Sequence, residues 1–293
     1  PAVRADVEGS PGLFPFVFII IACGAASGFH SLVASGTTAR QLNKETDARF
    51  IGYGGMIGES MLGFVAVLAT TAGMTSHVEW EARYANWGAI QSLGPQVGVF
   101  IRGCTRFLEG IGIPATVGAS FISVIVVSYA LTSLDSATRL LRYNIEEIGA
   151  FINVKFLQDR YIASLLAIAT IAFFAYYEIG GKPAGLALWQ LFGTTNQILA
   201  GLALLVITVY LLKRKWPWYV SGIPMVALLI VTIDAMVIKI LEFYNHPQGT
   251  EWPLVIIGSL LLVLAVWLIL EGILAVWKFK KSGTTVEQYD VEV

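Results

Sequence analysis

The 293-residue chain is 56% hydrophobic and 13% charged, and its mean hydropathy is +0.71. A soluble domain carries about 25% charged residues, so this composition argues against a surface that faces water on all sides. The net charge of −1 excludes an overall field that would attract nucleic acid, and two cysteines, Cys23 and Cys104, are too few for a disulfide framework or a Cys-rich metal site.

Apolar runs long enough to cross a bilayer recur along the chain. A bilayer core about 30 Å thick requires roughly 20 predominantly apolar residues in one helix. By that measure the sequence predicts an all-α polytopic membrane protein with about seven transmembrane helices. In chain order, the predicted spans are 14–35, 51–74, 114–134, 160–179, 185–212, 217–243 and 252–277.

The basic residues indicate how these spans are oriented. Most of the 19 Lys and Arg lie in alternate loops and in the tail. Because cytoplasmic loops carry the excess of Lys and Arg, the N-terminus is predicted to lie outside and the C-terminus in the cytoplasm. The residues behind this assignment are Arg40, Lys44 and Arg49; Arg139, Arg142, Lys155 and Arg160; Lys213, Arg214 and Lys215; and Lys278, Lys280 and Lys281.

The first predicted span combines two glycines with a histidine and hydroxyl side chains. Glycines four residues apart allow close packing against another helix, and a histidine inside a span can simply bond to a neighbouring helix. The same glycines also permit the helix to unwind, which exposes backbone groups to a substrate, and an intramembrane histidine usually faces a cavity or the bundle interior. The candidate substrate-binding residues here are Gly24, Ser27, Gly28, His30 and Ser31.

The stretch 75–113 separates the second and third spans and is too polar to cross a membrane. It contains Glu79, Glu81, Arg102 and Arg106 among apolar and aromatic side chains. We expect an external segment with short amphipathic helices that lie across the outer face. Such a segment is either a lid over a pathway or an ordinary connecting loop with structure of its own.

The third predicted span ends in a polar stripe. Ser128, Thr132 and Asp135 share one face by the 3.6-residue period, and Ser133 widens that face. Hydroxyls and a carboxylate are hard oxygen ligands that suit a small cation or a proton site. Asp135 is also four residues from Arg139, which is the spacing of an ordinary helix ion pair. A coupling-ion role and a solvated ion pair therefore both remain open.

The fifth predicted span carries uncharged hydrogen-bonding side chains well inside an apolar run. Thr194, Asn196 and Gln197 can hold helices together by side-chain bonds, or they can line a polar pathway. The sequence has no GxxxxGK[ST] loop, which disfavours an ATP-driven engine in this chain, and no HExxH or GxSxG motif, which disfavours a membrane enzyme. No catalytic residue, metal site or cofactor is predicted.

Three motifs carry a resemblance to a known family. The segments FPFVFIIIACGAASGFHSLVASGTTARQL (14–42), ALTSLDSATRLLRY (130–143) and LWQLFGTTNQILAGLALL (188–205) occur in this order. Together they resemble the carbon starvation protein A family, over about residues 13–212. The resemblance implies a multi-pass protein of the bacterial inner membrane that imports peptides, or pyruvate by proton symport, during nutrient starvation.

The resemblance also implies a fold. The family is similar to the amino acid–polyamine–organocation (APC) superfamily, whose LeuT-type core has ten helices in two inverted repeats. On that template, residues 1–212 hold the second repeat with 75–113 as its external lid, 213–279 hold two additional helices, and 280–293 form a cytoplasmic tail. The third span then supplies the coupling-ion site, with Thr132 and Ser133 as its first candidates.

The resemblance further implies what the chain works with. The expected partners are a small substrate (pyruvate or a peptide), a coupling cation (H⁺ or Na⁺), membrane lipid and the N-terminal half of the same transporter. Family members are much longer, and this chain begins at Pro1 without a methionine, so a fragment or a processed piece is expected. Thr194 and Thr195 replace small alanines, and Ser136 replaces a common threonine, so substrate preference can differ. The alternative function is a non-transporting membrane sensor or assembly module.

Overall fold

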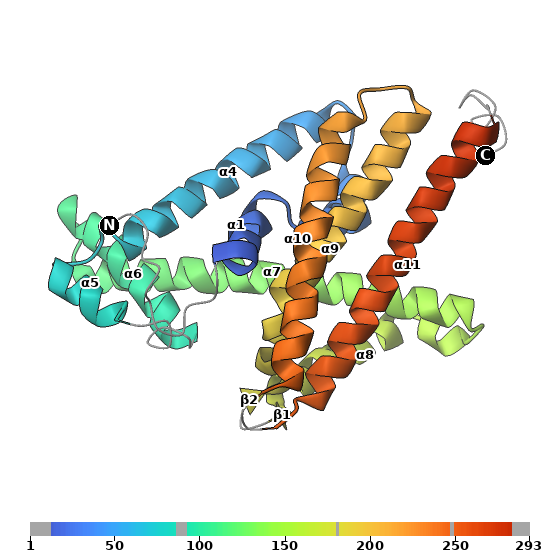
Figure 1. The fold of residues 1–293 in the computed structure, drawn as a ribbon. Helices are drawn as coiled ribbons and strands as arrows, with labels where there is room; N and C mark the ends of the chain where they lie inside the picture. The colour runs from blue at the N-terminus through green and yellow to red at the C-terminus, as the bar shows by residue number, and fades with distance from the viewer. Residues whose placement is uncertain (1–12, 86–92, 180–181, 247–248, 283–293) are drawn as a thin grey trace. The chain divides into compact units, whose positions relative to one another are not determined.

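The computed structural model describes residues 13–85, 93–179, 182–246 and 249–282 (Figure 1). Within these residues, six helices are long and apolar enough to cross a membrane, so the chain is a multi-pass membrane protein. These helical segments are Leu13–Gln41, Asp47–Thr70, Ala115–Phe151, Leu191–Lys213, Tyr219–Tyr244 and Trp252–Lys278.

The fourth predicted span is shorter than the six helices just named. It forms α8 (Arg160–Tyr176), which has 17 residues and falls below the length required of a spanning helix. A two-stranded antiparallel hairpin follows, in which β1 (Glu178–Ile179) pairs with β2 (Lys182–Pro183). The hairpin takes up residues that the sequence assigns to the end of this span, because Gly180, Gly181 and Pro183 disfavour a helix there.

The chain divides into two compact units. Unit 1 contains Thr37–Ser164, and unit 2 contains Gly12–Gly36 together with Leu165–Val293, as far as these are described.

Three long helices form the centre of unit 2. They are α9 (Ala184–Lys213), α10 (Tyr219–Tyr244) and α11 (Trp252–Ser282), and they pack against one another in pairs (Figure 1). Glycines bring these helices close: a Cβ on Gly201 would lie 2.4 Å from Leu229, and a Cβ on Gly272 would lie 2.5 Å from Leu205. Such small-residue contacts are the usual means of helix association in lipid. The buried core of this group comprises Leu191, Ile198, Met236, Phe243, Leu254 and Ala265.

The first predicted span also belongs mostly to unit 2, and it is a broken helix. Its main pieces are α1 (Phe18–Ala25) and α2 (Gly28–Val33), preceded by the turn η1 (Leu13–Val17). The wide turn η2 (Ala34–Thr38) and the short helix α3 (Ala39–Gln41) follow. Both α1 and α2 contact α9.

Unit 1 holds α4 (Asp47–Thr70), α5 (His77–Arg83), α6 (Leu93–Gly110), α7 (Ala115–Phe151) and the turn η4 (Lys155–Gln158). The end of α4 crosses α6 at very short range. A Cβ on Gly103 would lie 2.0 Å from the carbonyl oxygen of Ala69, and a Cβ on Gly73 would lie 2.5 Å from that same oxygen. Helix α6 also packs on α7.

Helix α7 continues well beyond the predicted end of its span at residue 134. It runs to Phe151, because no glycine or proline interrupts the sequence between Gly118 and Gly149. Its 37 residues correspond to about 55 Å of helix at 1.5 Å per residue, which exceeds a bilayer core of about 30 Å. The Arg142–Glu146 ion pair, at 3.6 Å, supports the polar extension.

The segment 75–113 contains two helices, α5 and α6, as far as it is described; residues 86–92 lie outside the described residues. Helix α5 begins with reciprocal capping. The Ser76 hydroxyl accepts from the Glu79 backbone N–H at 3.2 Å, and the Glu79 carboxylate accepts from the Thr75 N–H at 2.9 Å. The predicted tail, 280–293, lies outside the described residues from 283 onward.

Candidate functional site

The most distinctive feature of unit 2 is the interruption between α1 and α2. Helix α1 ends at Ala25, and the next two residues, Ala26 (φ −143°, ψ 90°) and Ser27 (φ −98°, ψ 127°), are extended. Helix α2 then begins at Gly28. The Ser27 hydroxyl accepts from the His30 N–H at 3.4 Å, which is the role of an N-cap residue. The run from Gly24 to Gly28 therefore breaks the helix, as one of the two interpretations of the sequence predicted.

Asn196 on α9 connects to both sides of this break. Its Nδ2 group donates to the Cys23 Sγ atom of α1 at 2.9 Å. Its Oδ1 atom accepts from the Phe29 backbone N–H of α2 at 2.8 Å, and from the Ser27 hydroxyl at 3.3 Å. Asn196 is 4% exposed, and its three bonds are partly buried.

Gly28 seats the start of α2 directly on α9. A Cβ at this position would lie 2.4 Å from the Asn196 carbonyl oxygen, 2.5 Å from the Leu199 Cβ and 2.7 Å from the Ala200 nitrogen. Gly28 is buried, whereas Gly24 is exposed, and a Cβ on Gly24 would have no neighbour within 4 Å among the described residues. The two glycines of the motif thus differ: Gly28 permits close contact, and Gly24 leaves open space.

The polar groups at the break are mostly hydrogen-bond acceptors. The last carbonyls of a helix have no partner within that helix. Among the last carbonyls of α1, the Ala22 oxygen accepts a hydrogen bond from the Ala26 backbone N–H at 2.8 Å. In α2 the Phe29 and His30 amides already donate to Asn196 and Ser27. The carbonyls of the unwound end of α1 are suited to N–H or O–H donors or to a small cation.

The remaining candidates of α2 face different surroundings. His30 is exposed, and its ring meets the Phe29 ring edge-on at 6.2 Å. The Ser31 hydroxyl donates to the Gly28 carbonyl oxygen at 2.6 Å. Ser31 therefore has a bond within its own helix, and His30 lies where it can contact another molecule.

The other two candidates of α9 have surroundings that differ from those of Asn196. The Thr194 hydroxyl donates to the Leu191 carbonyl at 3.0 Å and lies 3.8 Å from the Met236 sulfur of α10. Gln197 is 0% exposed, and neither amide atom has a hydrogen-bond partner among the described residues. An unpaired buried amide is costly, so a partner for Gln197 is missing from the described part of the chain.

Thr232 on α10 is a buried polar residue that sequence reasoning missed. The contacts Gly201–Leu229 and Thr194–Met236 fix the register of antiparallel α9 and α10, and Thr232 falls midway between the two contact points on α10. It is 0% exposed, and its hydroxyl donates to the Leu228 carbonyl at 2.6 Å. Cys23 was missed too, although it lies four residues before Ser27, which is the spacing of neighbours on one helix face.

The coupling-ion candidates lie in unit 1, on α7. Ser128, Thr132, Ser133 and Asp135 are all exposed in the described chain. The Ser128 and Thr132 hydroxyls donate to carbonyls of their own helix at 2.8 and 2.9 Å. The predicted Asp135–Arg139 ion pair forms at 2.9 Å. No group of three or more His, Cys, Asp or Glu arranged for a metal ion occurs in the described part of the chain.

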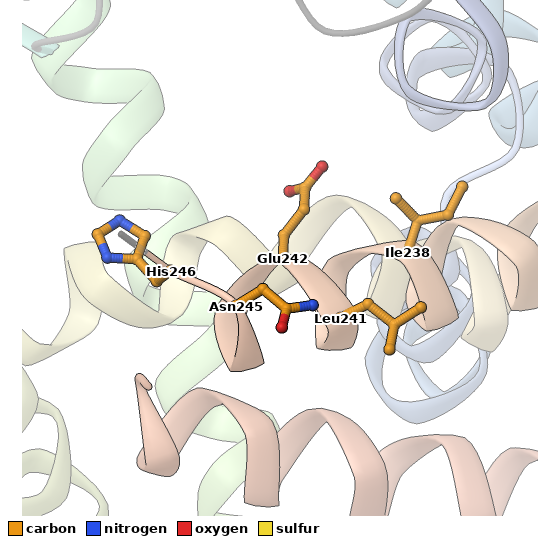
Figure 2. Close-up of a pocket in the computed structure, with 5 residues that line it drawn as sticks. All are labelled: Ile238, Leu241, Glu242, Asn245 and His246. Carbon is orange, nitrogen blue, oxygen red and sulfur yellow. The ribbon is translucent and has the colours of Figure 1, made fainter. Parts of the chain in front are cut away.

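An open hollow lies at the C-terminal end of α10 (Figure 2), where Ile238, Leu241, Glu242, Asn245 and His246 line it. These residues come from the end of α10 and from the two positions that follow it. None of them takes part in the hydrogen bonds that hold the α1–α2 interruption. The hollow is therefore a surface depression separate from the α1–α2 interruption.

Comparisons with known proteins place the chain in a family. The family model "Carbon starvation protein CstA" matches residues 2–91 and 79–235. "Peptide transporter CstA" of Mycobacterium tuberculosis (strain ATCC 25618 / H37Rv) is 34% identical, over 82% of this chain and 38% of the relative. "Pyruvate/proton symporter BtsT" of Escherichia coli (strain K12) is 32% identical, over 85% of this chain and 44% of the relative.

A third relative, "Peptide transporter CstA" of Helicobacter pylori (strain J99 / ATCC 700824), is 30% identical over 84% of this chain and 43% of its own length. No solved structure matches the chain. The chain spans less than half the length of these curated relatives. The matched family model covers most of the sequence, and the three motifs noted above fall within it. This chain belongs to the carbon starvation protein CstA family.

Proposed function

We propose that this chain is the C-terminal part of a secondary active transporter that imports pyruvate or peptides across the bacterial inner membrane during carbon starvation. The observation that carries the proposal is the break between α1 and α2, held against α9 by Asn196. Broken helices with polar backbone are tolerated at membrane depth only where they lie within protein or line a cavity. The names of the relatives, peptide transporter and pyruvate/proton symporter, fit this use of the break.

The proposed architecture is the second inverted repeat of an APC-superfamily (LeuT-type) core, with α10 and α11 as two additional helices. In this scheme α8, the fourth span in chain order, also crosses the membrane and brings the number of spans to seven. The hairpin and its flanking residues complete the length that α8 lacks. The N-terminus lies outside, the C-terminus is cytoplasmic, and the segment 75–113 is the external lid. The alternating Lys and Arg loops support this orientation.

We assign the substrate region to the break and its neighbours. Gly24 and Gly28 provide backbone, Ser27 and Ser31 provide hydroxyls, and His30 provides an exposed imidazole. Behind them, α9 contributes Thr194, Asn196 and Gln197. The coupling cation, H⁺ or Na⁺, is assigned to Ser128, Thr132, Ser133 and Asp135 on α7. The substrate site is completed by the N-terminal half of the full-length protein, and neither a cofactor nor an enzymatic step is required.

Uptake measurements on the full-length protein test this function. Cells that carry it should accumulate labelled pyruvate or a labelled dipeptide, and His30→Ala should reduce that accumulation. His246→Ala is the matched control, because His246 follows the end of α10 and lies outside both the proposed substrate region and the proposed lid.

The outcomes separate transport from the alternative. Unchanged uptake in His30→Ala removes this residue from the site. Binding of substrate to the full-length protein without accumulation in cells identifies a sensor or assembly module instead. Reconstituted vesicles add the coupling test: a proton symporter acidifies the lumen only when substrate enters.

A further inference from the structure

Asn196 contacts both half-helices with a single carboxamide. Its N–H group holds the Cys23 sulfur of α1 at 2.9 Å, and its oxygen holds the Phe29 N–H of α2 at 2.8 Å. The Ser27 hydroxyl, from the extended segment between the halves, bonds the same oxygen at 3.3 Å. All three structural parts of the interruption are therefore tied to one buried residue of α9.

These bonds occupy most of the hydrogen-bonding capacity of the Asn196 carboxamide. The oxygen accepts two hydrogen bonds, which fills its two lone pairs, and one N–H of the amide is engaged by sulfur. Little capacity remains for a substrate. The backbone of α9 is also covered at this point, because Gly28 lies against the Asn196 carbonyl oxygen and the Ala200 nitrogen.

We infer that Asn196 is a positioning residue: it latches α1 and α2 together at the break and sets how readily one half moves relative to the other. Any displacement of α1 against α2 that keeps α9 in place breaks at least one of its bonds. A buried donor left unpaired is costly, so each bond biases the chain toward the latched arrangement. Asn196 acts on substrate through the half-helices and does not bind it.

Cys23 gives the latch a readout that needs no transport. The thiol is partly exposed and lies at the end of α1 beside the break. Alkylation proceeds through the thiolate at an accessible sulfur, so loosening the break around the partly exposed Cys23 should raise the alkylation rate. The other cysteine of the chain, Cys104, is buried in α6 and is replaced by alanine for this measurement.

The experiment uses full-length protein in native membranes, with Cys23 as its one remaining cysteine and N-ethylmaleimide as the probe. Asn196→Leu, which keeps the bulk and removes every bond, should raise the alkylation rate of Cys23 by about fivefold, the factor expected for a lost buried hydrogen-bonded contact. Thr195→Val is the matched control, because the Thr195 hydroxyl donates to the Leu191 carbonyl of its own helix, at 2.7 Å, and not to the break. This control should leave the rate unchanged.

A second measurement separates the latch from direct substrate contact, and here the inference rests on the proposed function. Loosening the latch changes the fraction of binding-competent protein, so the apparent affinities for pyruvate and for a dipeptide should change by the same factor. A residue that touches substrate changes them by different factors. Asn196→Ala removes the same bonds without placing a charge beside the thiol, so it should raise the alkylation rate of Cys23 as Asn196→Leu does.

The inference is overturned if alkylation of Cys23 is unchanged in Asn196→Leu, or if the two affinities change independently. If Asn196→Leu does not reach the membrane, Asn196→Ala decides the matter by the same alkylation assay. If no substrate is transported by the wild type while Asn196→Leu still accelerates alkylation, the latch stands and the proposed function fails.

Discussion

The carboxamide oxygen of Asn196 accepts a hydrogen bond from the Phe29 backbone N–H at 2.8 Å, across 167 positions of sequence. In a membrane, a backbone N–H released by helix breakage has no water to bond and needs a partner from the protein. Asn196 provides that partner at the first turn of α2. The interruption of the first span therefore depends on a residue of the fifth span.

Gly28→Ala should strongly destabilise the protein. The added methyl would meet the Asn196 carbonyl oxygen, the Leu199 Cβ and the Ala200 nitrogen at 2.4–2.7 Å. Overpacking against side chains costs roughly 1–3 kcal/mol, and backbone atoms yield less than side chains do. The thermal midpoint of the detergent-solubilised full-length protein, followed by size-exclusion chromatography, measures the loss.

Gly24→Ala is the comparison for this change, since nothing lies within 4 Å of its Cβ position among the described residues. Its thermal midpoint should stay at or above that of the wild type. Equal losses in both variants would show that Gly28 does not pack on α9 in the full-length protein.

Gln197→Met should maintain or raise stability. The Gln197 amide is fully buried without a hydrogen-bond partner among the described residues, and methionine replaces it with an apolar group of similar shape. Removing such an amide is worth about 1–3 kcal/mol. The same variant should lose transport, because we assign Gln197 to the substrate region; thermal melting and uptake are measured on one preparation.

Thr232→Val tests whether the expected effect on stability is specific to the unpaired Gln197 amide. The Thr232 hydroxyl already donates to the Leu228 carbonyl, so its loss relieves no unpaired group. A drop in the stability of Gln197→Met comparable to a lost buried hydrogen bond would reveal a partner for the amide in the full-length protein.

Gly103→Ala should disrupt the crossing of α4 and α6. Its new methyl would lie 2.0 Å from the Ala69 carbonyl oxygen and 2.6 Å from the Ala69 carbonyl carbon. We expect a loss of at least about 1–3 kcal/mol, seen as lower yield of folded protein and a lower thermal midpoint. Gly98→Ala, on the same helix with no described atom within 4 Å, should gain about 0.5–1 kcal/mol from helix propensity.

Asp135→Asn should leave stability nearly unchanged while impairing coupled uptake. The Asp135–Arg139 pair is exposed: 69% of the Asp135 side chain and 39% of the Arg139 side chain are accessible. Exposed ion pairs contribute about 0–1 kcal/mol to stability. Proton-driven uptake of pyruvate by the full-length protein is the measurement. Arg139→Gln removes the pair but keeps the carboxylate, so uptake lost equally in both variants would assign the effect to the pair and not to a coupling site.

Acid should loosen the start of α5. Hydrogen bonds from the Thr75 hydroxyl and backbone N–H, with Arg83 nearby, lower the pKa of Glu79 from 4.5 to about 2. Because the folded-state pKa lies below the ordinary value, this contribution is complete above pH 4.5 and is lost as pH falls toward 2. Hydrogen exchange of the peptide that contains α5, corrected for the intrinsic rate, should therefore accelerate below pH 4.5.

Two variants check the assignment of this acid effect. Glu79→Gln should show fast exchange in α5 at every pH, because its side chain lacks the charge that Thr75 and Arg83 stabilise. Glu81→Gln removes only the pair with His77 and should keep the wild-type pH dependence. A pH-independent exchange rate in the wild type would contradict the role of Glu79.

The sequence by itself determined the membrane character of the chain and where along the first span a break was possible. Hydrophobic length is a local property, so the spans of α4, α9, α10 and α11 could be found from apolar runs alone. The cluster of small residues from Gly24 to Gly28, with Ser27 as a cap, marks the point where α1 ends and α2 begins. The three family motifs are likewise local strings, and the family match includes them.

Only the tertiary structure decided what each polar residue does. Thr194, Asn196 and Gln197 follow one another within four positions and look equivalent in sequence, yet they have different surroundings: the core with Met236, the break, and a buried position without a partner among the described residues. Helical periodicity separates their faces by about 100° per residue but does not say which helix lies opposite each face. That depends on the packing of α1, α2 and α10 around α9, which is set by non-local contacts such as those of Gly28 and Gly201.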